Sequence, residues 1–446
     1  MTKMKKSGVK WIGEIPISWE KIKIKNVCKK VYAGGTPSTD VTEFWDGNIP
    51  WIPSGACHNN MIYNTDTFIT EKGLKNSSTK YIPSKTTIIA MTGATCGNVG
   101  YLEFDTCANQ SVTAYVEEKR KLYSLYLFYV LQAAKEYILT FQTGGAQAGI
   151  NVENCKNFVI PITKLEEQKR IADLLKVKIK EIDSILEKLN IEIEILDKYK
   201  QSLITETVTK GLNPNIGMKE SNIDWIGSIP KNWNCKKIKY IITNDKNGIK
   251  VGPFGSSLTD AVVGKDEGEY KIYGQANLIR KDFNFGDNFV IEKDYKRLIN
   301  YEVLPNDIAV SMMGTIGKCC VVPKNIKKGI MDSHLIKIRL QNNIVPKYFE
   351  YQYESRAIYE QLMYFSNGAI MNGLNSTIVK NIYLVIPNKK EQQEIVDYLD
   401  KKCGEINILL RDKQAQIEKM EQYKKSLIYE YVTGKKRVKG AEELYG

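Results

Sequence analysis

An internal duplication constrains the fold of this chain more than any other feature of its 446 residues. The segment WIGEIPISWEKIKIKNV begins at Trp11, and WIGSIPKNWNCKKIKYI begins 214 positions later, at Trp225. Two long charged segments also match each other and end at Thr209 and Thr433, 224 positions apart. Each half therefore consists of a short tryptophan-containing lead, a variable block and a long charged segment. Such repetition predicts two similar modules related by a pseudo-two-fold axis.

The two long charged segments are predicted to be helices that pair as an antiparallel coiled coil. In the first, apolar residues alternate steps of four and three, the spacing of a coiled-coil seam: Leu175, Ile179, Ile182, Leu186, Leu189, Ile193 and Leu196, continued after one shortened step by Tyr199 and Leu203. The second repeats most of this seam at Leu399, Ile406, Leu410, Ile417, Met420, Tyr423 and Leu427. At ~1.5 Å per residue each helix would be roughly 65 to 70 Å long. Two separate surface helices are the alternative.

Both helices carry start and stop signals. The spacing of a capping box occurs at Thr163 with Glu166 and at Asn388 with Glu391. Gly211 and Gly434 follow the last turns, where glycine commonly ends a helix.

The variable blocks are predicted to mix α and β structure, so the fold class is α+β. YIPSKTTIIAMTG and VLPNDIAVSMMG are strand-like runs that enter glycine turns, whereas SLYLFYVLQAAKEYILTF and PKYFEYQYESRAIYEQLMYF have helical spacing. Asn213-Pro214-Asn215 is a plausible linker. We expect a first mixed domain over residues 1–164, a helix over 165–211, a second mixed domain over 212–388, a second helix over 389–434 and a basic tail over 435–446.

Charge and missing motifs narrow the function classes. Lys and Arg number 64 against 51 Asp and Glu, a net charge of +13, which favours a polyanionic partner. A basic protein without such a partner is the alternative. No apolar run could span a bilayer and no signal peptide is evident, so we expect a cytoplasmic protein with reduced thiols. The two histidines, His58 and His334, exclude HExxH sites, and no phosphate-binding loop is present. We therefore expect neither catalysis nor a metal site.

The ordered motifs resemble the specificity subunit of type I restriction–modification systems over nearly the whole chain. YAGGTPSTDVTEFWDGNIPWIPSGA, from Tyr32, is similar to a common opening of that family's target recognition domains. GPFGSSL from Gly252, with YKIYGQANL from Tyr270, is similar to a second variant. MTGATCG and MMGTIGK lie where the family has a strand and a glycine turn, and EEQKRIADLL and EQQEIVDYL match the start of its conserved helices.

The resemblance implies a division of labour. A specificity subunit reads a bipartite, asymmetric sequence in double-stranded DNA, one half per target recognition domain, across a spacer that the helices set. It docks two methyltransferase subunits and, through them, the nuclease-translocase subunits. S-adenosylmethionine, ATP and Mg²⁺ belong to those partners, so this chain is expected to bind no cofactor and to be no enzyme.

Two alternatives remain open. The chain could serve a methylation-only or silent system without a nuclease. It could also be a coiled-coil adaptor with two modules that bind carbohydrate or protein. DNA binding through phosphates should weaken steeply as salt rises, which separates the second alternative from DNA recognition.

The candidate DNA-contacting residues fall into three groups. Turn residues that offer hydroxyls or a close backbone approach are Gly34, Gly35, Thr36, Ser38, Thr92, Gly252, Phe254, Gly255, Ser256 and Ser257. Side chains in polar turns that could pair with base edges are Asn109, Gln110, Ser111, Gln275 and Asn277; for the amides, a capped turn is equally open. Candidate phosphate contacts are Lys72, Lys75, Lys80, Lys250, Arg280, Lys281 and Lys318. Six tryptophans are expected to hold structure instead: Trp45 and Trp51 the first loop, and Trp11, Trp19, Trp225 and Trp233 the helix ends.

Overall fold

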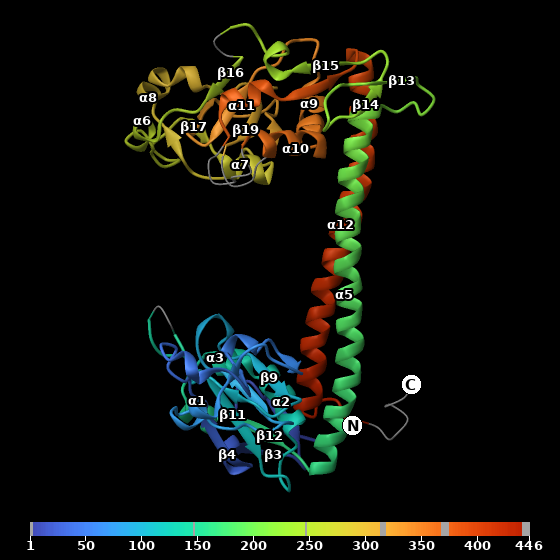
Figure 1. The fold of residues 1–446 in the computed structure, drawn as a ribbon. Coiled ribbons are helices and arrows are strands. Elements are labelled where there is room, and N and C mark those ends of the chain that lie inside the picture. Colours follow the sequence, from blue (N-terminus) through green and yellow to red (C-terminus); the bar gives the residue numbers. More distant parts are fainter. Residues whose placement is uncertain (1–2, 146–147, 246–247, 313–317, 367–373, 439–446) are drawn as a thin grey trace. The chain divides into compact units, whose positions relative to one another are not determined.

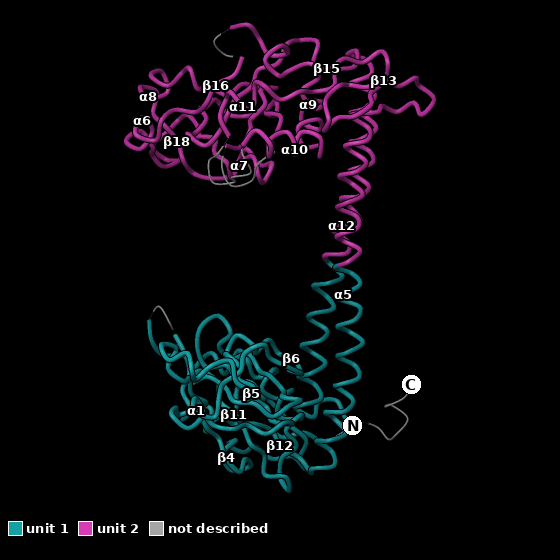
Figure 2. The backbone as a smooth tube through the Cα atoms, viewed as in Figure 1, with its two compact units in different colours: residues 1–190, 415–446 teal, residues 191–414 magenta. Residues whose placement is uncertain are grey.

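The computed structural model describes residues 3–145, 148–245, 248–312, 318–366 and 374–438, and the chain divides into two compact units (Figures 1 and 2). Unit 1 comprises Met1–Asn190 and Ala415–Gly446, and unit 2 comprises Ile191–Gln414. Each unit therefore contains one variable block together with part of each long helix, as the duplication predicts.

The two long helices are α5 (Leu165–Lys210) and α12 (Lys389–Val432). In unit 1 the first turns of α5 share a buried core with the last turns of α12, through Ile171, Leu175, Ile179 and Ile182 with Leu427, Ile428, Tyr431 and Val432. In unit 2 the last turns of α5 share a core with the first turns of α12, through Ile204 and Val208 with Ile395, Val396, Leu399 and Cys403. The helices therefore pair antiparallel within each unit, which confirms the predicted coiled coil.

Two seam predictions are wrong. Tyr199 is 55% exposed and Tyr423 is 52% exposed. Each follows the preceding seam residue by three positions after another three-residue step, and two such steps turn the helix too little to stay on the seam. Lys200 and Lys424 take the inner positions instead: Lys200 donates to Asn407 at 2.7 Å in unit 2, and Lys424 donates to Asp183 in unit 1. These two contacts are the same pair in the two repeats.

The helix ends follow the predicted signals with one exception. The Asn388 side chain accepts from the Glu391 N–H at 3.0 Å and caps α12. Gly211 and Gly434 have φ of +78° and +72°, the left-handed conformation that ends a helix. The capping box at Thr163 does not form with Glu166, because the Thr163 hydroxyl donates to the Glu167 carboxylate.

The variable block of unit 1 folds around a five-stranded sheet in the order β4-β11-β8-β9-β6. Its strands are β4 (Cys28–Ala33), β6 (Asn60–Ile62), β8 (Thr87–Ala90), β9 (Val99–Leu102) and β11 (Val112–Glu117). A three-stranded sheet, β10-β5-β7, contains β5 (Trp45–Ile52), β7 (Phe68–Ile69) and β10 (Cys107–Ala108). The helices are α1 (Glu71–Lys75), α2 (Ser124–Ala133), α3 (Lys135–Leu139) and α4 (Val152–Asn157). One buried cluster joins the sheet to α2, α5 and α12.

The variable block of unit 2 has a four-stranded antiparallel sheet in the order β16-β22-β19-β20. Its strands are β16 (Ile249–Val251), β19 (Ile308–Ser311), β20 (Cys319–Val321) and β22 (Leu335–Ile338). A second sheet, β18-β17-β21, contains β17 (Tyr270–Tyr273), β18 (Phe289–Val290) and β21 (Gly329–Met331). The helices are α6 (Gly255–Thr259), α7 (Gln275–Arg280), α8 (Glu292–Arg297), α9 (Pro346–Tyr353), α10 (Arg356–Phe365) and α11 (Ser376–Asn381).

The two leads form equivalent pairs of short strands. In unit 1, β1 (Met4–Lys6) pairs with β2 (Glu14–Pro16), and β3 (Glu20–Lys23) with β12 (Val159–Ile162). In unit 2, β13 (Met218–Glu220) pairs with β14 (Ser228–Pro230), and β15 (Asn234–Lys237) with β23 (Tyr383–Ile386).

Two of the four lead tryptophans, Trp19 and Trp233, hold ends of the long helices as predicted, whereas Trp11 and Trp225 contact other elements. Trp19 and Trp233 are fully buried. The Trp19 indole donates to Glu167 on α5 at 3.1 Å and lies against Gly434, while Trp233 lies against Gly211. Trp11 donates to the Val159 carbonyl at 3.2 Å. Trp225 packs on Tyr364 and Phe365 at the end of α10.

Candidate nucleic-acid interface

One end of the large sheet in unit 1 gathers loops that are far apart in the sequence. Because neighbouring strands run antiparallel, β4 and β8 finish at the end where β11 and β9 begin. The segments at this end are residues 34–38 after β4, residues 91–98 between β8 and β9, and residues 109–111 before β11. Predicted site residues in these segments are Gly34, Gly35, Thr36, Ser38, Thr92, Asn109, Gln110 and Ser111.

The two glycines at this end are required by close backbone packing. A Cβ on Gly34 would lie 2.0 Å from the Ala108 carbonyl oxygen, and one on Gly35 would lie 2.4 Å from the Thr79 nitrogen. Both residues are buried. Gly34 and Gly35 therefore support the loop from inside, and the prediction that they meet DNA is replaced by this structural role.

Two tryptophans fasten the same loop. The Trp51 indole donates to the Gly35 carbonyl at 3.0 Å, and the Trp45 indole donates to the Ser38 carbonyl at 3.0 Å. Their rings meet edge to face, with centroids 5.3 Å apart. The prediction that both hold the loop is confirmed.

Polar side chains of two of these segments, residues 34–38 and 109–111, meet at the surface. The Thr36 hydroxyl donates to the Gln110 side-chain oxygen, so two predicted residues 74 positions apart are in contact. Asn109 uses its side-chain oxygen to accept from the Ser111 N–H at 3.0 Å. Ser38 and Gln110 are exposed, whereas Thr92 is half-buried beside Gly149. Ser38 and Gln110 are thus the most accessible polar side chains of this end.

The candidate cations of unit 1 are not equivalent. Lys80 is exposed and lies over the Tyr32 ring, 5.6 Å from its centroid. Lys72 is bound to Glu43 at 2.8 Å, a hydrogen bond that raises the pKa of Lys72 and partly neutralises its charge. Lys80 is therefore the better candidate for a phosphate contact.

The four-stranded sheet of unit 2 has the same topology as four strands of unit 1. In chain order both run first-fourth-second-third across the sheet, as β4-β11-β8-β9 and as β16-β22-β19-β20. β16 and β19 finish at the end where β22 and β20 begin. Gly252 takes the place of Gly34: a Cβ on it would lie 1.7 Å from the Asp332 carbonyl oxygen, and its N–H donates to Leu335 at 2.9 Å. Most of the predicted MMGTIGK turn lies outside the described residues.

The loop after β16 presents an unusual side chain. Phe254 is 84% exposed, and its neighbours Gly255, Ser256 and Ser257 are exposed as well. Single exposed apolar side chains are common on protein surfaces, but none of the large apolar side chains that the structure describes has a larger exposed fraction than Phe254. Phe254 is therefore the most conspicuous candidate contact of unit 2.

The candidate cations of unit 2 also differ in whether a carboxylate binds them. Lys250 lies 5.4 Å from the centroid of the Tyr301 ring, Arg280 stacks 4.1 Å from that of Phe285, and Lys318 is exposed. Lys281 is bound to Glu350 at 2.8 Å and to Glu354 at 3.3 Å. Lys281 therefore already has two carboxylate partners, and its contact with phosphate stays a prediction.

The amide prediction for unit 2 requires a correction. Asn277 is only 5% exposed; its oxygen accepts from Gly274 at 2.9 Å, and its amide donates to the carbonyls of Asp282 and Phe285 at 3.1 and 2.7 Å. It is a buried cap and not a base contact. Gln275 is half-buried and donates to Ser311 at 2.8 Å.

The structural counterpart of Asn109-Gln110-Ser111 is Asp332-Ser333-His334, which sequence reasoning missed. Both triplets directly precede the fourth strand of their sheet. The His334 N–H donates to the Asp332 carboxylate at 2.8 Å, as the Ser111 N–H donates to Asn109. Burial raises the pKa of Asp332, which the hydrogen bond from His334 opposes. A polar triplet immediately before an apolar run, NQSVTAYV and DSHLIKI, was the available signal.

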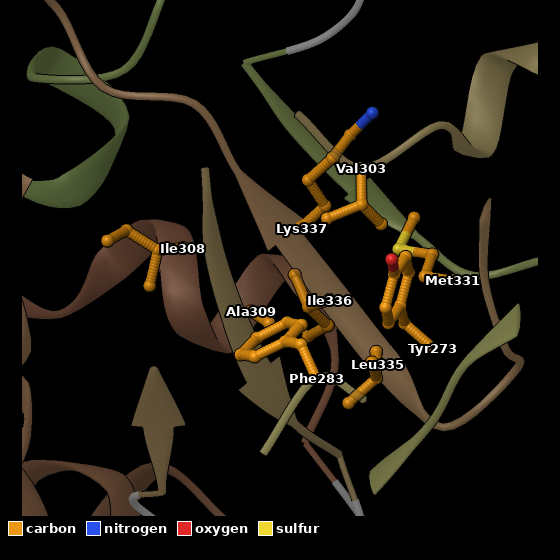
Figure 3. A pocket seen from close by; sticks show the side chains of 9 residues that line it. All are labelled: Tyr273, Phe283, Val303, Ile308, Ala309, Met331, Leu335, Ile336 and Lys337. Atoms are coloured by element: carbon orange, nitrogen blue, oxygen red, sulfur yellow. The ribbon is translucent and has the colours of Figure 1, made fainter. Parts of the chain in front are cut away.

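Two hollows of unit 2 differ in kind. The first, about 520 Å³, is lined by Gly255, Gln275, Asn288, Asp332, Ser333 and His334 among others. The second, about 10 Å³, lies between the apolar side chains drawn in Figure 3 and is too small for a ligand. The Lys337 amine in Figure 3 points away from those side chains and donates to the Glu302 carbonyl; burial lowers the pKa of Lys337.

Within the described ranges, no three His, Cys, Asp or Glu side chains are grouped so that they could hold a metal ion. No helix among the same residues is both long enough and apolar enough to cross a membrane.

Comparisons with known proteins agree with this architecture. A family model described as "Type I restriction modification DNA specificity domain" matches residues 16–195 and 230–419. The type I restriction enzyme MjaVIII specificity subunit of Methanocaldococcus jannaschii is 23% identical over 432 residues, which cover 95% of this chain and 94% of that protein. The EcoR124I/EcoR124II specificity subunit of Escherichia coli is 31% identical over 202 residues, 44% of each chain.

A solved structure shares the fold. It is described as "Structural basis underlying complex assembly and conformational transition of the type I R-M system", and it superposes with a TM-score of 0.70 at 14% identity. The superposition covers 94% of this chain and 98% of that one.

Proposed function

The chain belongs to the type I restriction modification DNA specificity family, and from this premise we propose that it is the DNA-recognition subunit of a type I restriction–modification complex. One observation carries the proposal. Both units present the same end of a sheet with the same strand order and the same glycine packing, but with different polar side chains. Two sheet ends with the same backbone arrangement but different side chains suit a bipartite target whose two halves differ in sequence.

The exposed groups at the two sheet ends match the chemistry of duplex DNA. Phosphates are met by lysine and arginine side chains, which Lys80, Lys250, Arg280 and Lys318 provide. Base edges are met by hydroxyl and amide groups such as Ser38 and Gln110. The net charge of +13 supports the same partner.

The helices support docking of two methyltransferase subunits, one on each unit. Unit 1 exposes Ile185 on α5 and Tyr423 on α12, and unit 2 exposes their repeat equivalents, Leu409 on α12 and Tyr199 on α5. Each unit therefore presents an equivalent pair of exposed side chains, one aliphatic residue and one tyrosine. Two like surfaces explain two like partners, to which nuclease-translocase subunits would attach.

Catalysis belongs to the partners in this proposal. S-adenosylmethionine, ATP and Mg²⁺ would bind to the methyltransferase and nuclease-translocase subunits, and the chain itself would contribute recognition. Turnover of DNA by the chain purified free of partners would contradict this division.

Salt dependence tests DNA recognition on the chain alone. We expect affinity for duplex DNA to fall linearly on a log–log plot against salt, because phosphate contacts release counterions. Lys80→Ala and Lys318→Ala should each reduce the slope by about 1. Lys198→Ala, which removes an exposed lysine bound to Glu194 on α5, is the control and should leave the slope unchanged. Binding that ignores salt would instead favour an adaptor with non-DNA ligands.

A further inference from the structure

We infer that the turn Asp332-Ser333-His334 reads base edges and determines the half-site of unit 2. The inference rests on the proposed function and names its specificity element in this unit. The sequence analysis did not single out these three residues. The two amides that it did single out in this unit, Gln275 and Asn277, form hydrogen bonds within the protein.

The backbone places this turn where Asn109-Gln110-Ser111 lies in unit 1. In unit 1, Met91 N–H donates to the Ser111 carbonyl at 2.7 Å, and Gly34 N–H donates to Val112 at 3.0 Å. In unit 2, Met312 N–H donates to the His334 carbonyl at 2.9 Å, and Gly252 N–H donates to Leu335 at 2.9 Å. The two triplets therefore occupy equivalent positions in the two sheets.

Within the turn the three side chains have different roles. Asp332 is half-buried, and its carboxylate accepts from the His334 backbone, so it is a positioning residue. The His334 side chain is 53% exposed, and Ser333 is half-buried beside it, with its hydroxyl 3.4 Å from His334 Nδ1. A hydroxyl and an imidazole can each donate to or accept from base edges in the major groove.

The surroundings leave room for a nucleotide. Asp332, Ser333 and His334 line the hollow of about 520 Å³, together with Gly255 and Asn288. A base edge can therefore approach Ser333 and His334 without displacing the core.

The two units differ in sequence at this turn. The glycine packing and the backbone hydrogen bonds are shared by both units and cannot give two half-sites different sequences. The triplets differ at every position, Asn-Gln-Ser against Asp-Ser-His. Since sequence is read by side chains at base edges, these positions can give the two half-sites different sequences.

The test maps N6-methyladenine in cells that express the full chain with the methyltransferase encoded beside it. The half-site of unit 2 is assigned as the half that persists when residues 25–160 are replaced by the block of another specificity subunit. We expect His334→Ala and the double variant Ser333→Ala/His334→Ala to relax that half alone, with discrimination reduced roughly 5- to 150-fold per lost contact. Asn342→Ala is the control: Asn342 is exposed beyond the opposite end of β22 and should leave both halves unchanged.

An unchanged motif in both His334 variants overturns the inference while the proposed function stands, whereas a wild-type complex with no gapped motif overturns the proposed function itself. A variant that methylates nothing is assayed for binding to duplexes mutated in one half. Discrimination lost only in the half of unit 2 supports the inference, and discrimination retained there overturns it.

Discussion

At the scale of single residues, the structure separates side chains that build the sheet ends from those that these ends present. Gly34, Gly252 and Trp51 build them, since they are defined by close backbone approach or by an internal hydrogen bond. Phe254 and His334 are presented, because they are exposed in segments whose neighbours are held firmly. Substitutions of the residues that build the sheet ends should therefore lower stability. Substitutions of the presented residues should instead weaken DNA binding or relax its specificity.

Two glycines three positions apart test the role of close approach. Gly252→Ala should lower the free energy of unfolding by about 3 kcal/mol, because its Cβ would meet the Asp332 carbonyl at 1.7 Å. Gly255→Ala should be nearly neutral, since nothing lies within 4 Å of its Cβ position. Urea unfolding measures both variants, and equal stabilities would contradict the packing described for Gly252.

Phe254 tests the role of an exposed aromatic side chain. Phe254→Ala should leave the unfolding midpoint unchanged and weaken binding to duplex DNA by roughly 1.5–3 kcal/mol, the free energy of burying a phenylalanine side chain in the interface. Tyr240, 61% exposed before β16 and thus toward the other end of the sheet, provides the matched control as Tyr240→Ala. Equal losses of affinity in the two variants would show that Phe254 has no special part in binding.

Glu350 tests a buried charge. It accepts from Lys281 and Lys347, each at 2.8 Å; burial acts to raise its pKa, but the two lysines outweigh burial and the net pKa is lowered. A carboxyl whose pKa is lower in the folded state adds stability that is present above its ordinary pKa of ~4.3 and is lost as pH falls through the folded value.

Glu350→Gln should therefore cost roughly 1.5–3 kcal/mol at pH 7 and show a shallower loss of stability below pH ~4.5 than the wild type. Glu360→Gln, which removes an exposed partner of Arg356, should keep the wild-type slope. Urea unfolding between pH 3 and 7 makes the comparison, and parallel curves for Glu350→Gln and wild type would refute the assignment.

At the scale of elements, the coiled coil shows what periodicity can and cannot predict. Alternating steps of three and four identified both helices and most buried seam positions, such as Leu175 and Leu399. Where two three-residue steps follow each other, the pattern did not reveal that Tyr199 and Tyr423 turn outward and lysines turn inward. That choice depends on the facing helix, where Asn407 and Asp183 offer partners.

Contacts between distant segments also limited what the sequence could predict about the candidate site. Glycine turns and tryptophans were recognisable because their chemistry is local. The match between Asn109-Gln110-Ser111 and Asp332-Ser333-His334 was hidden, because it arises from the pairing of β11 with β8 and of β22 with β19. The burial of Asn277 was likewise invisible, since two of its hydrogen-bond partners, Asp282 and Phe285, lie beyond the end of its own helix.

Two residues one turn apart on α12 test the division between seam and surface. Leu427 is 3% exposed, so Leu427→Ala should cost about 2–5 kcal/mol of unfolding free energy. Tyr423→Ala should cost little stability and should weaken the complex with the methyltransferase. Thermal unfolding and co-purification measure the two effects, and a stability loss for Tyr423→Ala equal to that for Leu427→Ala would place Tyr423 in the seam after all.

At the scale of the whole molecule, the duplication explains why one chain can carry two half-sites and two docking surfaces. The Lys424–Asp183 contact of unit 1 and the Lys200–Asn407 contact of unit 2 are repeat equivalents, so the internal symmetry extends from the fold to individual side-chain pairs. The variable blocks break this symmetry in their additional strands and helices and in the side chains presented at the sheet ends. We therefore expect this chain to recognise an asymmetric, bipartite target.

The most direct measurement is a genome-wide map of N6-methyladenine in cells that express this chain with the methyltransferase encoded beside it, compared with cells that express the methyltransferase alone. We expect a gapped motif with two different halves that disappears without this chain. A soluble complex that methylates no gapped motif, or a motif with two identical halves, would contradict this expectation.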